Sequence, residues 1–257
     1  MDLTEALVVL AAGLGAGLVI TAVGAGSLVS FPLLLTVGLS PLVANVSNTV
    51  GLVPGGLSGS WGYRRELAEK SRLVLAVAVT SGAGALAGAV VLLVMPSAAF
   101  ATAVPWLVIF AATLVAVQPL LSVRLAARTA ARGGPHTRRE DMSSWLRGVS
   151  VVIGGYGGYF GAGQGVMLVA FLALGLDHDL QVVNGLKNVA VLAANLAATL
   201  VFVVAAPLDW PVVGLVALGS VVGGWLGAHI GRRLPPMLFR VLVVAFGYAV
   251  GARLLVG

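Results

Sequence analysis

Apolar segments separated by short polar or glycine-rich stretches make up most of the chain. They cover residues 5–23, 26–38, 42–62, 73–95, 99–122, 148–160, 163–176, 183–206, 211–231 and 237–256. A helix needs about 20 apolar residues to cross a bilayer. Segments 26–38, 148–160, 163–176 and, marginally, 5–23 are too short, and they form two pairs, each joined by glycine-rich sequence. The pattern predicts an all-α polytopic membrane protein with about 8–10 membrane segments, some of them short or broken.

The composition agrees with a membrane protein. Hydrophobic residues make up 59% of the 257 residues and charged residues only 9%, whereas a soluble domain carries about 25% charged residues. The net charge of +6 does not indicate nucleic acid binding, because the basic residues gather in short loops between apolar segments. The composition therefore predicts the lipid bilayer as a partner and no nucleic acid, and the small anionic substrate that we also expect rests on the features described below.

The basic residues also predict an orientation. Three loops hold all of the Lys and Arg residues except Lys187 and Arg253. These residues are Arg64, Arg65, Lys70 and Arg72; Arg124, Arg128, Arg132, Arg138, Arg139 and Arg147; and Arg232, Arg233 and Arg240. Cytoplasmic loops are enriched in Lys and Arg. We therefore expect a multi-pass protein of the bacterial inner membrane with both termini outside. Each short pair then leaves and returns on one side, the first pair from outside and the second from inside, as full thin crossings or as re-entrant hairpins.

The two halves of the chain are related in sequence. Gly24-Ala25-Gly26 matches Gly161-Ala162-Gly163 at a spacing of 137, and Asn45 matches Asn184 at a spacing of 139. At the same spacing of 139, Ser81, Gly84 and Gly88 match Ser220, Gly223 and Gly227. A weak internal repeat with opposite topology is typical of secondary transporters, whose substrates bind near the midplane between the repeats. We expect an N-terminal membrane repeat over 1–122, a cytoplasmic linker over 123–147 and a C-terminal repeat over 148–257.

The glycine turns are the first candidate site. A helix broken at Gly24 and Gly26, or at Gly161 and Gly163, exposes the backbone N–H groups of the next half-helix, which favour an anion. Ser27 and Gln164 follow these turns at equivalent places in the two halves. We predict that these six residues contact the substrate. The alternative is that glycine only permits close helix packing.

Polar residues in two apolar segments form the second candidate group. Lys187 lies early in segment 183–206, either as a counter-charge for an anion entering from the cytoplasm or as a side chain that reaches the interface. Asn45 and Asn48 begin the third segment, and Asn184 and Asn188 begin its repeat mate. These asparagines either bind substrate or form hydrogen bonds between helices.

Other chemistry is absent from the pattern. No catalytic constellation, phosphate-binding loop or metal-ligand spacing is present, so we expect no enzyme activity, no catalytic residues, no metal and no cofactor. Gly84-x-x-x-Gly88 and Gly223-x-x-x-Gly227 are typical of helix packing. Glycine-rich faces allow a homodimer, but they serve internal packing equally well.

Several runs make the chain similar to the TauE/SafE sulfite exporters, also called four-toluene-sulfonate uptake permeases. They are Val23 to Pro32, Gly38 to Ala44, Gly157 to Gly163, Lys187 to Phe202 and Gly223 to Gly231. The resemblance spans nearly the whole chain, and Lys187 stands where relatives often have lysine. It implies the repeated membrane fold of the family and transport of sulfite, thiosulfate or an organosulfonate, usually outward for sulfite.

The expected function is secondary transport of a small sulfur-containing anion, with export favoured. A channel-like anion pore and a carrier of another small organic anion are the alternatives, and a membrane scaffold without transport is a third. The substrate, the direction and the coupling ion are not fixed by the sequence.

Overall fold

The computed structural model describes residues 1–131, 140–230 and 236–256, and within these ranges it forms helices and no strands. In chain order the helices are α1 (Leu3–Ala22), α2 (Ser27–Thr36), α3 (Pro41–Gly51), α4 (Val53–Trp61), α5 (Arg64–Leu67), α6 (Ser71–Val94), α7 (Ser97–Ala131), α8 (Ser144–Tyr159), α9 (Gln164–Gly175), α10 (Leu180–Ala205), α11 (Trp210–Ile230) and α12 (Pro236–Val256). The all-α fold is confirmed.

Helix length separates membrane-crossing helices from shorter ones. Within the described ranges α1, α6, α10, α11 and the first part of α7 are long and apolar enough to cross a bilayer. Helices α2 and α9 have 10 and 12 residues, so they are about 15 and 18 Å long, roughly half of the hydrocarbon thickness. Each therefore forms the short arm of a hairpin, after α1 and after α8. We name these the first hairpin (α1–α2) and the second hairpin (α8–α9).

Two predicted segments have different limits in the structure. Segment 42–62 is not one helix, because α3 ends at Gly51 and α4 begins at Val53. Pro54 has no N–H to donate to the carbonyl four residues earlier, which explains the interruption. Helix α7, predicted to end at residue 122, continues to Ala131. Of the basic residues used for orientation, Arg132, Arg138, Arg139, Arg232 and Arg233 lie outside the described residues.

The long arm of each hairpin packs against a helix from the other half of the chain. Helix α1 lies along α11, and α8 lies along α6. A Cβ on Gly17 would come within 2.9 Å of Ser220 Cα, and a Cβ on Gly154 within 2.8 Å of Ser81 Cα. Gly17 matches Gly154 at the spacing of 137, and Ser81 matches Ser220 at 139. The same contact thus occurs in both halves, as inverted repeats predict.

The predicted small-residue stripes lie in these interfaces. Gly84 packs against the backbone of Val151 in α8, and Gly223 packs against the backbone of Leu14 in α1. Glycine permits this close approach because any side chain would collide with the neighbouring backbone. The stripes therefore serve packing within the chain, as predicted.

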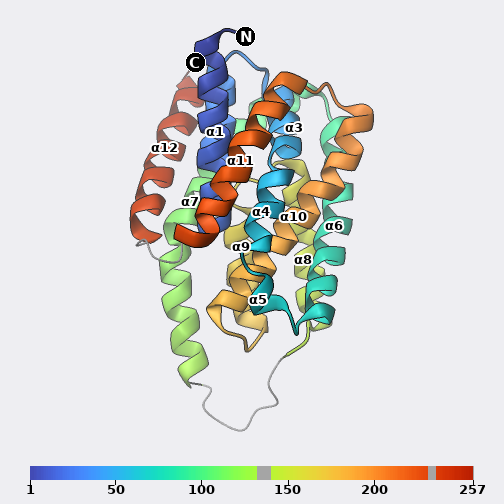
Figure 1. The fold of residues 1–257 in the computed structure, drawn as a ribbon, viewed down its shortest axis with the longest axis vertical. Coiled ribbons are helices and arrows are strands. Elements are labelled where there is room, and N and C mark those ends of the chain that lie inside the picture. The colour runs from blue at the N-terminus through green and yellow to red at the C-terminus, as the bar shows by residue number, and fades with distance from the viewer. Residues whose placement is uncertain (132–139, 231–235, 257) are drawn as a thin grey trace.

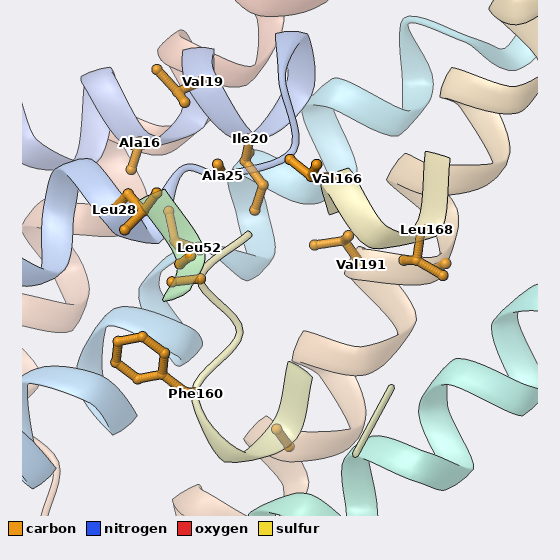
Figure 2. Close-up of a cluster of buried hydrophobic side chains, with 14 of the residues drawn as sticks. Ala16, Val19, Ile20, Ala25, Leu28, Leu52, Phe160, Val166, Leu168 and Val191 are labelled. Atoms are coloured by element: carbon orange, nitrogen blue, oxygen red, sulfur yellow. The ribbon is translucent and has the colours of Figure 1, made fainter. Parts of the chain in front are cut away.

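Large apolar side chains also cover the outside. All five tryptophans are more than half exposed, as are Leu75, Leu200 and Val204. Exposed apolar side chains on long helices fit a lipid-facing surface, and tryptophan is typical of its edges. Inside, a continuous apolar core surrounds the two turns, including Leu28, Phe160 and Val166 (Figure 2). The N- and C-terminal ends lie at one end of the molecule, and α5 and the last turns of α7 lie toward the other (Figure 1).

Candidate functional site

The two glycine turns touch each other inside the protein. The Gly165 N–H donates to the Gly24 carbonyl over 3.1 Å, which joins the start of α9 to the end of the first hairpin's turn. Gly24 has φ +91°, and a Cβ there would come within 2.8 Å of the Gly165 backbone. Ala25 and Val166, the residues that follow, both belong to the core shown in Figure 2. Sequence reasoning placed both turns in the site, and the structure brings them together.

The short helices begin where the sequence predicted, at Ser27 and Gln164. Four of their first N–H groups already have backbone partners. Leu28 and Val29 donate to the carbonyls of Ala25 and Gly26, and Gln164 and Val166 donate to those of Gly161 and Gly163. Helix starts usually leave such groups free for a ligand. In this conformation the turns themselves satisfy them, so a backbone-bound anion would need one of the turns to open.

Gly161 and Gly163 have φ +78° and +77°, in the region that favours glycine. Gly26 has an ordinary helical φ of −57°. Its role is close packing, because a Cβ there would lie 2.8 Å from Ile20 Cβ. The alternative that glycine permits packing therefore describes Gly26, whereas Gly24, Gly161 and Gly163 shape the turns.

Lys187 is fully buried, so the interpretation that it reaches the interface is wrong. Its Nζ donates to the carbonyls of Ile20 at 3.2 Å and Thr21 at 2.8 Å. These carbonyls end α1, where no following helical turn donates to them. The ammonium also lies at the negative end of the α1 dipole, which favours a cation. Lys187 therefore caps the long arm of the first hairpin from α10.

Asn45 does the same for the second hairpin from α3. Its Nδ2 donates to the Tyr159 carbonyl over 3.0 Å, at the last residue of α8. One turn further on, Asn48 Nδ2 donates to Ser27 Oγ over 3.3 Å. The two caps are thus reciprocal, since each half holds the hairpin of the other. One cap is an amide and the other an ammonium.

Several buried amide atoms of the predicted site residues have no hydrogen-bond partner in the described structure. They are Gln164 Oε1 and Nε2, Asn48 Oδ1 and Asn188 Nδ2. Gln164 is fully buried and packs over Gly157, in the last turn of α8. A buried polar group without a partner costs about 1–3 kcal/mol, so it marks a place where a ligand or water belongs. Asn184, by contrast, is only half-buried.

Tyr156 is a residue of this centre that sequence reasoning missed. Its hydroxyl donates to the Ala162 carbonyl over 2.7 Å and so ties the second turn to α8. Its repeat mate at the spacing of 137 is Val19, which has no such group. The only available signal was a tyrosine five residues before the glycine turn, inside an apolar segment.

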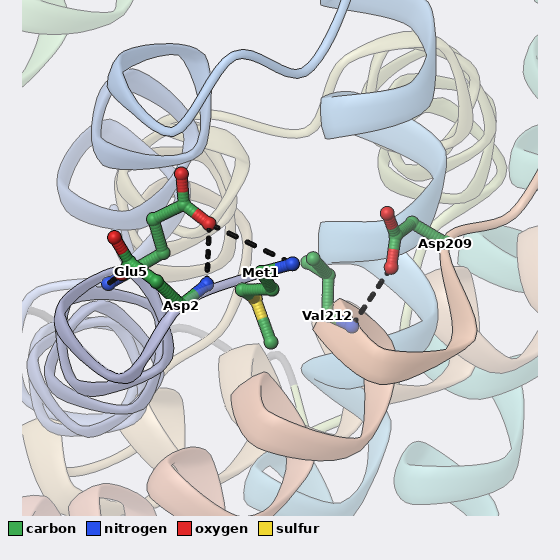
Figure 3. A network of polar contacts seen from close by, with 5 residues as sticks. All are labelled: Met1, Asp2, Glu5, Asp209 and Val212. Carbon is green, nitrogen blue, oxygen red and sulfur yellow. Dashed lines mark hydrogen bonds and ion pairs between the residues drawn. The ribbon is translucent and has the colours of Figure 1, made fainter.

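A recess of about 300 Å³ opens at the end of the molecule that carries the N-terminus. Its lining includes Glu5, Ser40 and Asp209. The carboxylates there act as helix caps, because Asp209 Oδ1 accepts from the Val212 N–H at 3.1 Å (Figure 3). Asp2 Oδ1 likewise accepts from the Glu5 N–H at 2.7 Å. Over the residues that the structure describes, no group of three His, Cys, Asp or Glu side chains is placed to hold a metal ion.

Comparisons with known proteins agree with this architecture. The sequence model of the family described as sulfite exporter TauE/SafE matches residues 9–254. A probable membrane transporter protein of Haemophilus influenzae is 26% identical over 234 residues, covering 90% of this chain and 87% of the relative. Another, the probable membrane transporter protein ORF9 of a Sinorhizobium species, is 24% identical over 243 residues, covering 93% and 88%. No solved structure matches the chain.

Proposed function

The chain belongs to the TauE/SafE sulfite exporter family of membrane transporters, and on this premise we propose that it exports a small sulfur-containing anion, sulfite or an organosulfonate, across the bacterial inner membrane. The anion binds between the two glycine turns. The family match supports a transporter, and the relatives' names do not specify a substrate. The sulfur-containing substrate therefore rests on the family match. The site supports an anion that carries several oxygens, and the direction is inferred from the charges along the path.

Gln164 is the observation that carries this proposal. It is fully buried at the start of α9, one residue from the contact between the turns, and neither of its amide atoms has a partner among the described residues. Its Nε2 can donate to a sulfite oxygen, and its Oε1 can accept from a protonated sulfite. Ser27 Oγ and the amides of Asn48 and Asn188 supply further polar groups. In an apolar core, these groups gain most from a ligand that carries several oxygens.

Charge supports movement outward. The positive-inside rule places the loops around α5 and before α8 in the cytoplasm, and the termini and the recess at Glu5 and Asp209 outside. Lys187 then lies seven residues into α10, about 10 Å above its cytoplasmic end. An anion therefore meets an ammonium on the inner side and carboxylates on the outer side. A membrane potential that is negative inside adds about 2.3 kcal/mol per charge per 100 mV in favour of export.

The test is transport by purified protein in liposomes with labelled sulfite. We expect saturable flux, with thiosulfate, sulfate and taurine added as competitors to rank the substrate class. Gln164→Leu should lower sulfite flux about tenfold or more, because one good polar contact in an apolar site is worth at least this factor. The same substitution should not lower stability, since it removes two unpartnered polar atoms.

The outcome also decides between the alternatives. Counterflow of labelled against unlabelled sulfite supports a carrier, whereas flux that does not saturate and shows no counterflow supports a channel-like pore. Flux of another anion without sulfite flux overturns the substrate. If Gln164→Leu lowers stability and leaves flux unchanged, Gln164 is a packing residue and the proposed site is wrong.

A further inference from the structure

Lys187 is a charged side chain in a position that an uncharged cap could fill. In the other half, the residue that caps the equivalent hairpin is the neutral Asn45. The residue that matches Lys187 in sequence, at the spacing of 139, is the neutral Asn48. Burying an ammonium costs several kcal/mol unless an opposite charge compensates for it. Among the residues that the structure describes, no carboxylate forms an ion pair with Lys187. Capping alone therefore does not explain the charge.

We propose that Lys187 is a latch that the transported anion releases: it holds the end of α1 when the site is empty and turns toward the anion when the site is filled. The inference rests on the proposed function. Its consequence is that the substrate's charge loosens the first hairpin, which then moves relative to α10.

The contacts of the ammonium support this exchange. A lysine has three N–H donors, and two of them reach the Ile20 and Thr21 carbonyls. The third can bind an arriving anion before either of these bonds breaks. A hydrogen bond between two opposite charges is stronger than one between an ammonium and a neutral carbonyl. In an apolar interior this difference increases, so the Lys187 ammonium binds the anion in preference to the two carbonyls.

The position of the latch links it to the glycine turns. Thr21 lies three residues before Gly24, whose carbonyl accepts from the Gly165 N–H. A shift of the α1 end therefore moves Gly24 away from Gly165 and frees an N–H at the start of α9. That N–H belongs to the residue that follows Gln164, the proposed ligand of the anion. Releasing the latch thus creates a donor for the substrate, which couples binding to the movement.

Hydrogen exchange of the full-length protein in nanodiscs, measured by mass spectrometry with and without sodium sulfite, tests the latch. In the wild type, sulfite should speed exchange over residues 20–30 about fivefold or more, the lower range of known couplings between sites. The control region is 147–157, in the α8 arm of the hairpin that the neutral Asn45 caps, because it contains neither Gln164 nor the Gly165 N–H. There, sulfite should leave exchange unchanged. Sodium chloride at equal ionic strength is the control for salt.

Lys187→Gln removes the positive charge and keeps a cap, because the glutamine amide can still donate to a carbonyl. We expect this variant to fold, to show the same exchange over 20–30 with and without sulfite, and to have a sulfite KM raised about tenfold. Saturable wild-type flux without any effect of sulfite on exchange overturns the latch and leaves the proposed function in place. If the sulfite KM of Lys187→Gln equals that of the wild type, the latch is likewise overturned and the proposed function stays in place. Absence of sulfite flux in the wild type overturns both.

Discussion

The first and second hairpins occupy equivalent places in the two halves, yet different chemistry holds them. An ammonium caps the first hairpin at Ile20 and Thr21, and an amide caps the second at Tyr159. Both caps come from the opposite half of the chain. The duplicated packing therefore fixes where the hairpins lie, and we propose that the side chains that differ between the halves decide how each hairpin responds to an anion.

The turns differ as well. The first has a single glycine with positive φ, Gly24, whereas the second has two, Gly161 and Gly163. Among the described hydrogen bonds, a side chain of the hairpin's own long arm ties only the second turn, through Tyr156. The second hairpin therefore has more local constraints, and the first depends more on contacts with other helices. This difference makes the first hairpin the better candidate for the moving part.

The largest effect that we expect from breaking this arrangement is that of Gly24→Ala. Alanine at φ +91° costs about 1–2 kcal/mol, and its Cβ would collide with the Gly165 backbone at 2.8 Å. We expect the free energy of unfolding, measured by SDS titration in mixed micelles, to fall by more than about 4 kcal/mol, with loss of flux.

Gly38→Ala is the matched control for this loss. Gly38 has φ +88°, but a Cβ there would meet nothing within 4 Å. Its free energy of unfolding should fall only by the conformational cost of alanine at positive φ, about 1–2 kcal/mol. Equal losses in the two variants would mean that the contact between the turns contributes little.

A smaller effect should come from Asn45→Leu, which leaves the Tyr159 carbonyl buried without a donor. We expect the free energy of unfolding to fall by about 1–3 kcal/mol, with faster hydrogen exchange near residue 159. The repeat mate Asn184 is only half-buried, so Asn184→Leu should change stability by less than about 0.5 kcal/mol. Similar losses for both would show that the halves are more alike than their contacts indicate.

Tyr156→Phe probes the constraint that only the second turn has. Removing the hydroxyl leaves the Ala162 carbonyl without its 2.7 Å donor, which should cost about 0.5–1.5 kcal/mol. Tyr159→Phe is the control on the same helix, since its hydroxyl makes only a 3.8 Å contact with Met95 Sδ. This control should cost less than about 0.5 kcal/mol. A larger loss for Tyr159→Phe would contradict the assignment of the tie to Tyr156.

Much of this architecture could be predicted because the bilayer restricts the choices. The lengths of the apolar segments predicted most of the helices. The pairs of glycines predicted the helix breaks before Ser27 and Gln164. The interruption at Leu52 was missed, although Pro54 was a usable signal. The extension of α7 to Ala131 was missed because its last turns carry Arg124 and Arg128 and follow Pro119.

The sequence singled out residues that the structure brings together, but it did not predict their contacts. The spacing of 137 residues paired Ser27 with Gln164, and the spacing of 139 paired Asn45 with Asn184. It could not show that Lys187 reaches α1, because the bond joins residues that lie 167 positions apart in the chain. The cap is a tertiary contact between halves, and sequence periodicity reports only which face of a helix a residue occupies.

The smallest effect that we expect is a gain, from Gly148→Ala in α8. Gly148 is exposed in the second turn of the helix, and a Cβ there would meet nothing within 4 Å. Its counterpart in α1 at the spacing of 137 is the exposed Ala11, so the variant makes the two long arms alike at this position. Alanine in place of glycine inside a helix should raise the free energy of unfolding by about 0.5–1 kcal/mol, with sulfite flux unchanged. Gly154→Ala, on the same helix, should lower it, because its Cβ would lie 2.8 Å from Ser81 Cα. A loss in Gly148→Ala would show that α8 needs flexibility at its N-terminal end, so that the second hairpin would move as well as the first.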